Sequence, residues 1–91
     1  MKDNDYYQVL RAALIKWGVT SQMRMLQEEC AELIVAVNRH ERNQSANTLH
    51  ALKEECADVE IMLDQARYVL SDWQPYVREK LDRLKGRLGD T

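Results

Sequence analysis

The chain contains few of the residues that tight turns and short strands require. Its 91 residues include only three glycines and one proline. So few turn residues argue against a fold of many strands. With 45% hydrophobic residues, the chain is also too apolar to be disordered. An all-α fold is therefore expected.

The sequence also lacks a strong excess of one charge and a long hydrophobic run. Thirteen basic and fifteen acidic side chains leave a formal net charge of −2, so we expect no nucleic acid and no anionic membrane as the main partner. No apolar run approaches the roughly 18 residues of a membrane span, and the start, MKDNDYY, does not resemble a signal peptide. We expect a cytoplasmic protein in which Cys30 and Cys56 are small buried thiols.

Apolar residues that recur every three or four positions predict one domain over residues 1–91, built from four helices. The expected helices cover about 7–17, 21–40, 48–70 and 75–88. Gly18 is expected to stop the first helix, and the polar segment 38–50 to contain the main loop. The expected N-caps are Thr20 or Ser21 for the second helix and Asn47 or Thr48 for the third. Short connections between four helices predict an antiparallel four-helix bundle.

Each long helix has an expected inward stripe of apolar residues. The stripes are Leu26, Cys30, Leu33 and Val37 in the second helix, and Leu52, Cys56, Val59, Leu63 and Ala66 in the third. Val35, Ile61 and Tyr68 remain outside these stripes, and a chain of this length has a modest core. We therefore expect a homodimer or homotetramer.

Inside the two most hydrophobic runs, the block EECA occurs twice, in LQEECAELIVAV and in LKEECADVEIML. Glu29 and Glu32 are three residues apart and so lie side by side on a helix, as do Glu55 and Asp58. If the second and third helices pack antiparallel, the two pairs can face each other across the seam. Two matched pairs beside apolar stripes are less typical of a solvated surface than one pair would be.

Four carboxylates in a partly dry site require a cation. An all-oxygen ligand set suits Mg²⁺, or Mn²⁺ in its place, better than zinc. A di-iron bundle would need a Glu three residues before a histidine. Neither His40 nor His50 has one, and we expect both on the surface.

The spacing EExxE, a polar loop and then EExxD resembles the MazG-like, all-α nucleoside triphosphate pyrophosphohydrolases. WGVTSQMRMLQEECAEL is similar to the lead-in and first acidic motif of that family, ECADVEIML to the second motif, and KLDRLKGRL to its basic C-terminal helix. The resemblance implies Mg²⁺-dependent hydrolysis of (d)NTP to (d)NMP and pyrophosphate, in house-cleaning of the nucleotide pool. It also implies that the metal ligands are Glu29, Glu32, Glu55 and Asp58.

Further residues are candidates for contacts to the reacting triphosphate. A carboxylate not fully engaged by metal, Glu32 or Glu55, can accept the proton of the attacking water. The spacing of Lys80, Arg83 and Arg87 predicts one basic stripe that can hold the β- and γ-phosphates. Candidates for stacking on or hydrogen-bonding to the base are Trp17, Gln22, Trp73 and Tyr76.

Two alternatives remain open at this point. A phosphoribosyl-ATP pyrophosphohydrolase would share the metal site but accept a larger substrate. A helical oligomerisation or adaptor module would use the EECA blocks to fix register through Lys or Arg of a partner.

Overall fold

The computed structural model describes residues 1–89, and these residues form four α-helices and no strand. The helices are α1 (Asn4–Trp17), α2 (Val19–Arg42), α3 (Ala46–Leu70) and α4 (Gln74–Gly89). The prediction of an all-α fold is confirmed. None of these helices combines the length and the apolar character needed to cross a membrane.

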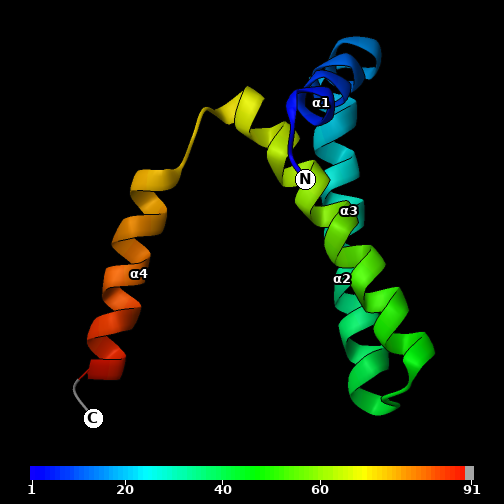
Figure 1. The fold of residues 1–91 in the computed structure, drawn as a ribbon, viewed down its shortest axis with the longest axis vertical. Coiled ribbons are helices and arrows are strands. Elements are labelled where there is room, and N and C mark those ends of the chain that lie inside the picture. Colours follow the sequence, from blue (N-terminus) through cyan, green and yellow to red (C-terminus); the bar gives the residue numbers. More distant parts are fainter. Residues whose placement is uncertain (90–91) are drawn as a thin grey trace.

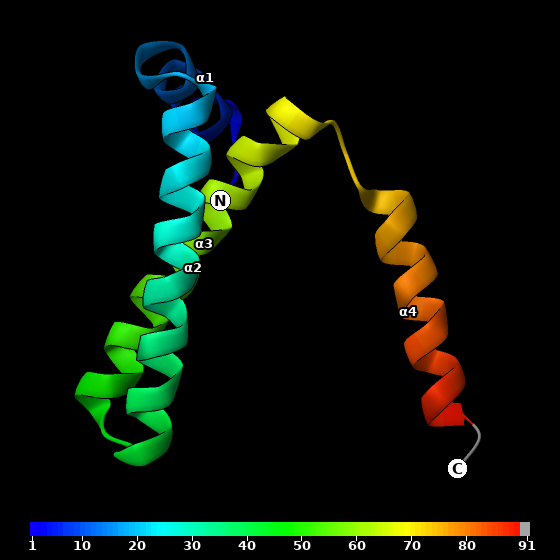
Figure 2. The same cartoon turned by 180° about the vertical axis from the view of Figure 1, so that it is seen from behind.

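α2 and α3 form a long antiparallel hairpin, and α1 packs across the end of this pair where α2 begins and α3 ends (Figures 1 and 2). α4 stands apart, with no contact to another helix within residues 1–89. The packed part of the predicted bundle therefore consists of three helices. The radius of gyration is 16.2 Å, against about 12 Å for a compact chain of this length.

Local signals explain where α1 and α2 begin and end. The side chain of Asp3 caps α1 by accepting a hydrogen bond from the backbone N–H of Tyr6, at 3.0 Å. Gly18 ends α1 as expected, with a φ of 87° that favours glycine. α2 then begins at Val19 without a side-chain cap, so the expected cap at Thr20 or Ser21 is wrong.

The polar loop is much shorter than expected, because only residues 43–45 separate α2 from α3. Ser45 caps α3 by accepting from the backbone N–H of Thr48 at 3.1 Å, and the Thr48 hydroxyl accepts from the backbone N–H of Ser45 at 3.0 Å. This reciprocal capping box starts α3 earlier than a cap at Asn47 or Thr48 would. The expected helix end near His40 was likewise too early.

The side chains between α2 and α3 differ in part from the expected stripes. Leu26, Leu33, Leu52 and Val59 are half-buried and Ala66 is buried, as expected for the packed faces. Cys30, Val37, Cys56 and Leu63 are exposed instead, so the prediction of two buried thiols is wrong. The packed faces are rotated slightly, and this rotation brings Glu29 and Glu55 into the seam.

At the other end of the hairpin, a hydrogen bond and an ion pair link the N-terminal segment and α1 to α3. Asp64, which is buried, accepts from the Tyr6 hydroxyl at 2.7 Å and pairs with the Lys2 amine at 2.9 Å. Burial alone would raise the pKa of Asp64, but these two partners and Arg67 hold it below its usual value. Among residues 1–89, the buried apolar residues are few: Leu10, Ala36 and Ala66.

Candidate functional site

The carboxylates of the two EECA blocks meet across the α2–α3 seam. Glu29 and Glu32 come from α2, and Glu55 comes from α3; one oxygen of each lies within 4.8 Å of the others. Asp58, one turn further along α3, is close enough for its charge to raise the pKa of Glu29. We call Glu29, Glu32, Glu55 and Asp58 the acidic cluster.

The acidic cluster is strained electrostatically. Burial is the largest cause that raises the pKa of Glu29, to about 7, and repulsion from Asp58, Glu32 and Glu55 adds to it. Burial, followed by the charges of Glu32 and Asp58, also raises the pKa of Glu55. A site that favours protonated carboxyls is short of positive charge.

Two carboxylate oxygens of the acidic cluster are left without a hydrogen bond. The Oε2 atoms of Glu29 and Glu55 are both buried, and neither has a hydrogen-bond partner among residues 1–89. Buried carboxylate oxygens normally have a partner, because an unpaired one loses its hydration without compensation. Two such oxygens on facing helices, in an all-oxygen donor set, fit a hard divalent cation such as Mg²⁺ or Mn²⁺.

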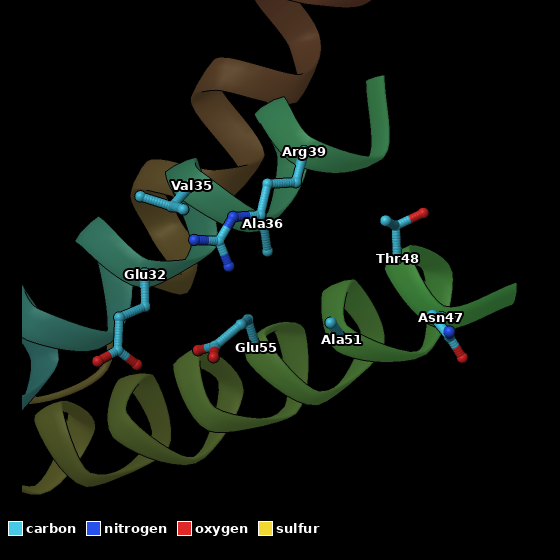
Figure 3. A pocket seen from close by; sticks show the side chains of 8 residues that line it. All are labelled: Glu32, Val35, Ala36, Arg39, Asn47, Thr48, Ala51 and Glu55. Atoms are coloured by element: carbon cyan, nitrogen blue, oxygen red, sulfur yellow. The ribbon is translucent and has the colours of Figure 1, made fainter. Parts of the chain in front are cut away.

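A hollow of about 550 Å³ opens beside the acidic cluster, between α2 and α3 toward their connecting loop. Its lining residues are Glu32, Val35, Ala36, Arg39, Asn47, Thr48, Ala51 and Glu55 (Figure 3). Glu32 and Glu55 lie on facing helices at one end. Arg39 extends its guanidinium into the space between the helices on the same side (Figure 3). We call this space the loop-side hollow.

Arg39 supplies the positive charge of the loop-side hollow. Its guanidinium makes no ion pair within the described part of the chain, although its carboxylate neighbours are short of cations. Arg39 was not among the candidate residues, although it lies within the expected second helix, 21–40. The signal was present, since Arg39 is seven residues after Glu32 and therefore on the same helical face.

A second hollow, of about 400 Å³, lies where α1 meets α2 and α3. Trp17 and Gln22, both expected to contact a base, line it together with Ala13, Ser21, Met25, Met62 and Gln65. Gln22 and Gln65 are buried. We call this space the α1-side hollow. Gln65 had no motif or charge to mark it in the sequence.

The structure does not bring the predicted basic stripe to the acidic cluster of the same chain. Lys80, Arg83 and Arg87 lie on α4, which packs on none of the other helices in residues 1–89. Arg83 lies 3.6 Å from Glu79. Trp73 is on the linker before α4, where Arg67 stacks on its ring at 4.3 Å, and Tyr76 is exposed on α4.

The chain matches no family model, and no curated protein and no solved structure matches it.

Proposed function

We propose that this chain is a Mg²⁺-dependent pyrophosphohydrolase that converts a nucleoside triphosphate to the monophosphate and pyrophosphate. One observation carries the proposal: the Oε2 atoms of Glu29 and Glu55 are buried and have no hydrogen-bond partner among residues 1–89, and both carboxylates gather with that of Glu32. The resemblance of the two acidic motifs to the MazG-like enzymes supports the same activity.

The cluster residues Glu29, Glu32, Glu55 and Asp58 would hold the metal. A bound divalent ion neutralises phosphate charge and lowers the pKa of a coordinated water. Without such a cation, a triphosphate and the acidic cluster would repel each other. Triphosphate binding and metal binding are therefore expected to depend on each other.

Hydrolysis forms a bond from the water oxygen to the α-phosphorus and breaks the bond from that phosphorus to the bridging oxygen of pyrophosphate. A carboxylate must take the proton of the attacking water. Glu55 suits this role because it lines the loop-side hollow and its pKa is raised, which makes it a stronger base. Glu32, which lines the same hollow, is the other candidate.

Arg39 is placed to bind the leaving phosphates. It lines the loop-side hollow with Glu32 and Glu55 and has no ion pair among the described residues. An arginine can donate two parallel hydrogen bonds to phosphate oxygens. The β- and γ-phosphates are therefore proposed to lie in the loop-side hollow.

The proposed enzyme is a homodimer or homotetramer. The chain buries few apolar side chains of its own, and α4 leaves Val77, Leu81, Leu84 and Leu88 exposed. A second copy can cover these residues and bring the Lys80, Arg83 and Arg87 of its α4 to the phosphates. Analytical ultracentrifugation tests whether the chain forms an oligomer. A compact monomer at micromolar concentration would contradict the proposed dimer or tetramer.

A mixing experiment tests whether α4 acts between copies. One variant carries Glu55→Gln; the other carries Lys80→Ala, Arg83→Ala and Arg87→Ala. If α4 of one copy completes the site of another, mixing two inactive variants restores part of the activity. No restoration, with mixed oligomers shown to form, would contradict a shared site.

The function itself is tested by incubating the protein with Mg²⁺ and a panel of canonical and modified NTPs and dNTPs, with phosphoribosyl-ATP included, and by measuring pyrophosphate. Glu29→Gln should lower turnover about 100-fold or more, because it removes a metal ligand. The matched controls are Glu28→Gln and Glu54→Gln, which change exposed carboxylates in the same blocks and should retain activity. Nucleoside diphosphate as the main product would refute the reaction, and no product at all would favour an adaptor.

A further inference from the structure

The α1-side hollow contains two buried polar side chains that the fold does not use. Gln22 is 6% exposed and Gln65 is 5% exposed. The Oε1 atom of Gln65 is buried and has no hydrogen-bond partner among residues 1–89. The side chain of Gln22 makes no hydrogen bond within the same residues. A desolvated amide oxygen without a partner destabilises a fold, so the buried Oε1 atom of Gln65 calls for an explanation.

The other lining residues suit a flat ring. The side chains of Met25 and Met62 are flexible and polarisable and can adapt to a planar ligand. Trp17 is 57% exposed, and the Lys16 ammonium lies over its ring at 5.3 Å from the centroid, which leaves the other ring face for stacking. The methionines and Trp17 can therefore contact the two faces of a heterocycle. The two glutamine amides can form hydrogen bonds to its edge.

The hollow lies on the same seam as the acidic cluster. Met25 precedes Glu29 by four residues and Met62 follows Asp58 by four, so the near wall is one helical turn from the cluster, about 6 Å along each helix. Gln22 and Gln65 are each seven residues from the same acids, about 10 Å along the helices. The loop-side hollow lies on the opposite side of the cluster.

We propose that the α1-side hollow binds the heterocyclic base of the nucleotide, and that Gln22 and Gln65 read its hydrogen-bonding edge. A primary amide presents a donor and an acceptor side by side, which is how Gln recognises a base edge elsewhere. A ring N–H or an exocyclic amine of the base donates to the Oε1 atom of Gln65. The identification of the ligand as a nucleotide rests on the proposed function.

In this arrangement the nucleotide lies along the α2–α3 seam. The base occupies the α1-side hollow, the α-phosphate the acidic cluster, and the outer phosphates the loop-side hollow with Arg39. Gln65 is then a residue that determines specificity without taking part in the chemistry.

The test uses binding of nucleoside monophosphates to the full chain with Mg²⁺. Deoxyribose 5-phosphate is the probe that lacks a base. In a Trp73→Phe background Trp17 is the remaining tryptophan, so its fluorescence reports on the α1-side hollow, and calorimetry gives the affinities. Monophosphates should quench Trp17 and bind at least tenfold more tightly than deoxyribose 5-phosphate.

Gln65→Leu should remove most of this base-dependent affinity, about tenfold or more, because a hydrogen bond is lost at a buried site. It should leave Mg²⁺ binding unchanged and should not lower Tm, since it removes an unpaired polar atom. Gln27→Leu is the matched control on an exposed position of α2 and should change nothing. A purely structural role for Gln65 would instead lower Tm and leave the relative affinities for different bases unchanged.

The outcomes separate this inference from the function. If no triphosphate is hydrolysed but Gln65-dependent binding of monophosphates persists, the reaction is refuted and the base site stands. If triphosphates are hydrolysed but Gln65→Leu and Gln22→Leu leave the relative kcat/KM across the panel unchanged, the base site is refuted. The base site would also be refuted if Trp17 fluorescence did not respond to monophosphates but changed with protein concentration. A second copy of the chain would then occupy the α1-side hollow.

Discussion

The α2–α3 pair and α4 both carry many charged side chains, but they place them differently. In the α2–α3 seam, one buried carboxylate oxygen each of Glu29 and Glu55 has no hydrogen-bond partner in the described part of the chain. On α4 the charged side chains are exposed, and several pair with each other, as Arg78 does with Asp82 at 2.6 Å. The position of a charge relative to the packed face therefore indicates function better than the number of charges does.

The largest effect on stability is expected from breaking a paired charge in the packed part. Asp64→Asn should destabilise the fold by about 2 kcal/mol, because Asp64 is buried and joins Lys2, Tyr6 and Arg67. Asp82→Asn, the matched change on α4, should cost less than about 0.5 kcal/mol, since the pair of Asp82 with Arg78 is exposed. Chemical denaturation measures the free energy of unfolding of both variants. Equal losses of stability would contradict the difference expected between the packed helices and α4.

A smaller effect is expected from the cation of the loop-side hollow. Arg39→Ala should raise KM for the triphosphate about tenfold, because a charge-assisted contact to phosphate is lost. Arg42→Ala is a control on the exposed end of the same helix that lines neither hollow. Steady-state kinetics at saturating Mg²⁺ makes the comparison. If Arg39→Ala and Arg42→Ala have the same KM for the triphosphate, Arg39 does not bind the phosphates.

The smallest of these effects is the pH dependence of the metal-free protein. Because the pKa of Glu29 is raised to about 7, the folded state binds a proton that the unfolded state releases between about pH 4.5 and 7. Stability in chelator should therefore rise as pH falls through 7, by on the order of 1 kcal/mol, or about 5 °C in Tm. Asp64 remains ionised above pH 5, so its opposite effect lies outside this window.

Thermal unfolding from pH 5 to 8 in chelator measures this dependence. Glu29→Gln should flatten most of the profile, because the carboxyl with the pKa of about 7 is gone, and Glu55, whose pKa is also raised, accounts for the slope that remains. A wild-type Tm that falls as pH falls through the same range would contradict the account.

The sequence was sufficient to predict the four helices and the meeting of Glu29, Glu32 and Glu55, because both depend on local periodicity. EECA at matching places on two antiparallel helices requires only the spacing of three and four residues and the direction of the chain. Arg39 and Gln65 were not predictable in the same way. Arg39 lies within the expected second helix, but no motif links it to the acidic residues, and the Ser45–Thr48 capping box extends both helices beyond the expected loop.

The position of α4 and the buried faces of α2 and α3 depend on tertiary packing. The sequence shows an apolar stripe on α4, but it does not show which surface covers that stripe. The expected stripes placed Cys30 and Cys56 inward, whereas a small rotation of each helix exposes both thiols. The same rotation places Glu29 and Glu55 in the seam, and periodicity alone does not resolve a rotation of this size.

The central claim is that the acidic cluster holds a divalent cation. The most direct measurement compares melting curves of the wild type and Glu55→Gln at pH 8, in chelator and in excess Mg²⁺. Glu54→Gln is the control, since Glu54 is exposed and pairs with His50 at 3.2 Å.

The account predicts that, in chelator, Glu55→Gln melts at a higher temperature than the wild type, because one charge of a repelling group is gone. It also predicts that Mg²⁺ raises the Tm of the wild type and of Glu54→Gln, and raises that of Glu55→Gln much less. A Glu55→Gln variant that is less stable in chelator and gains as much from Mg²⁺ as the wild type would contradict the claim.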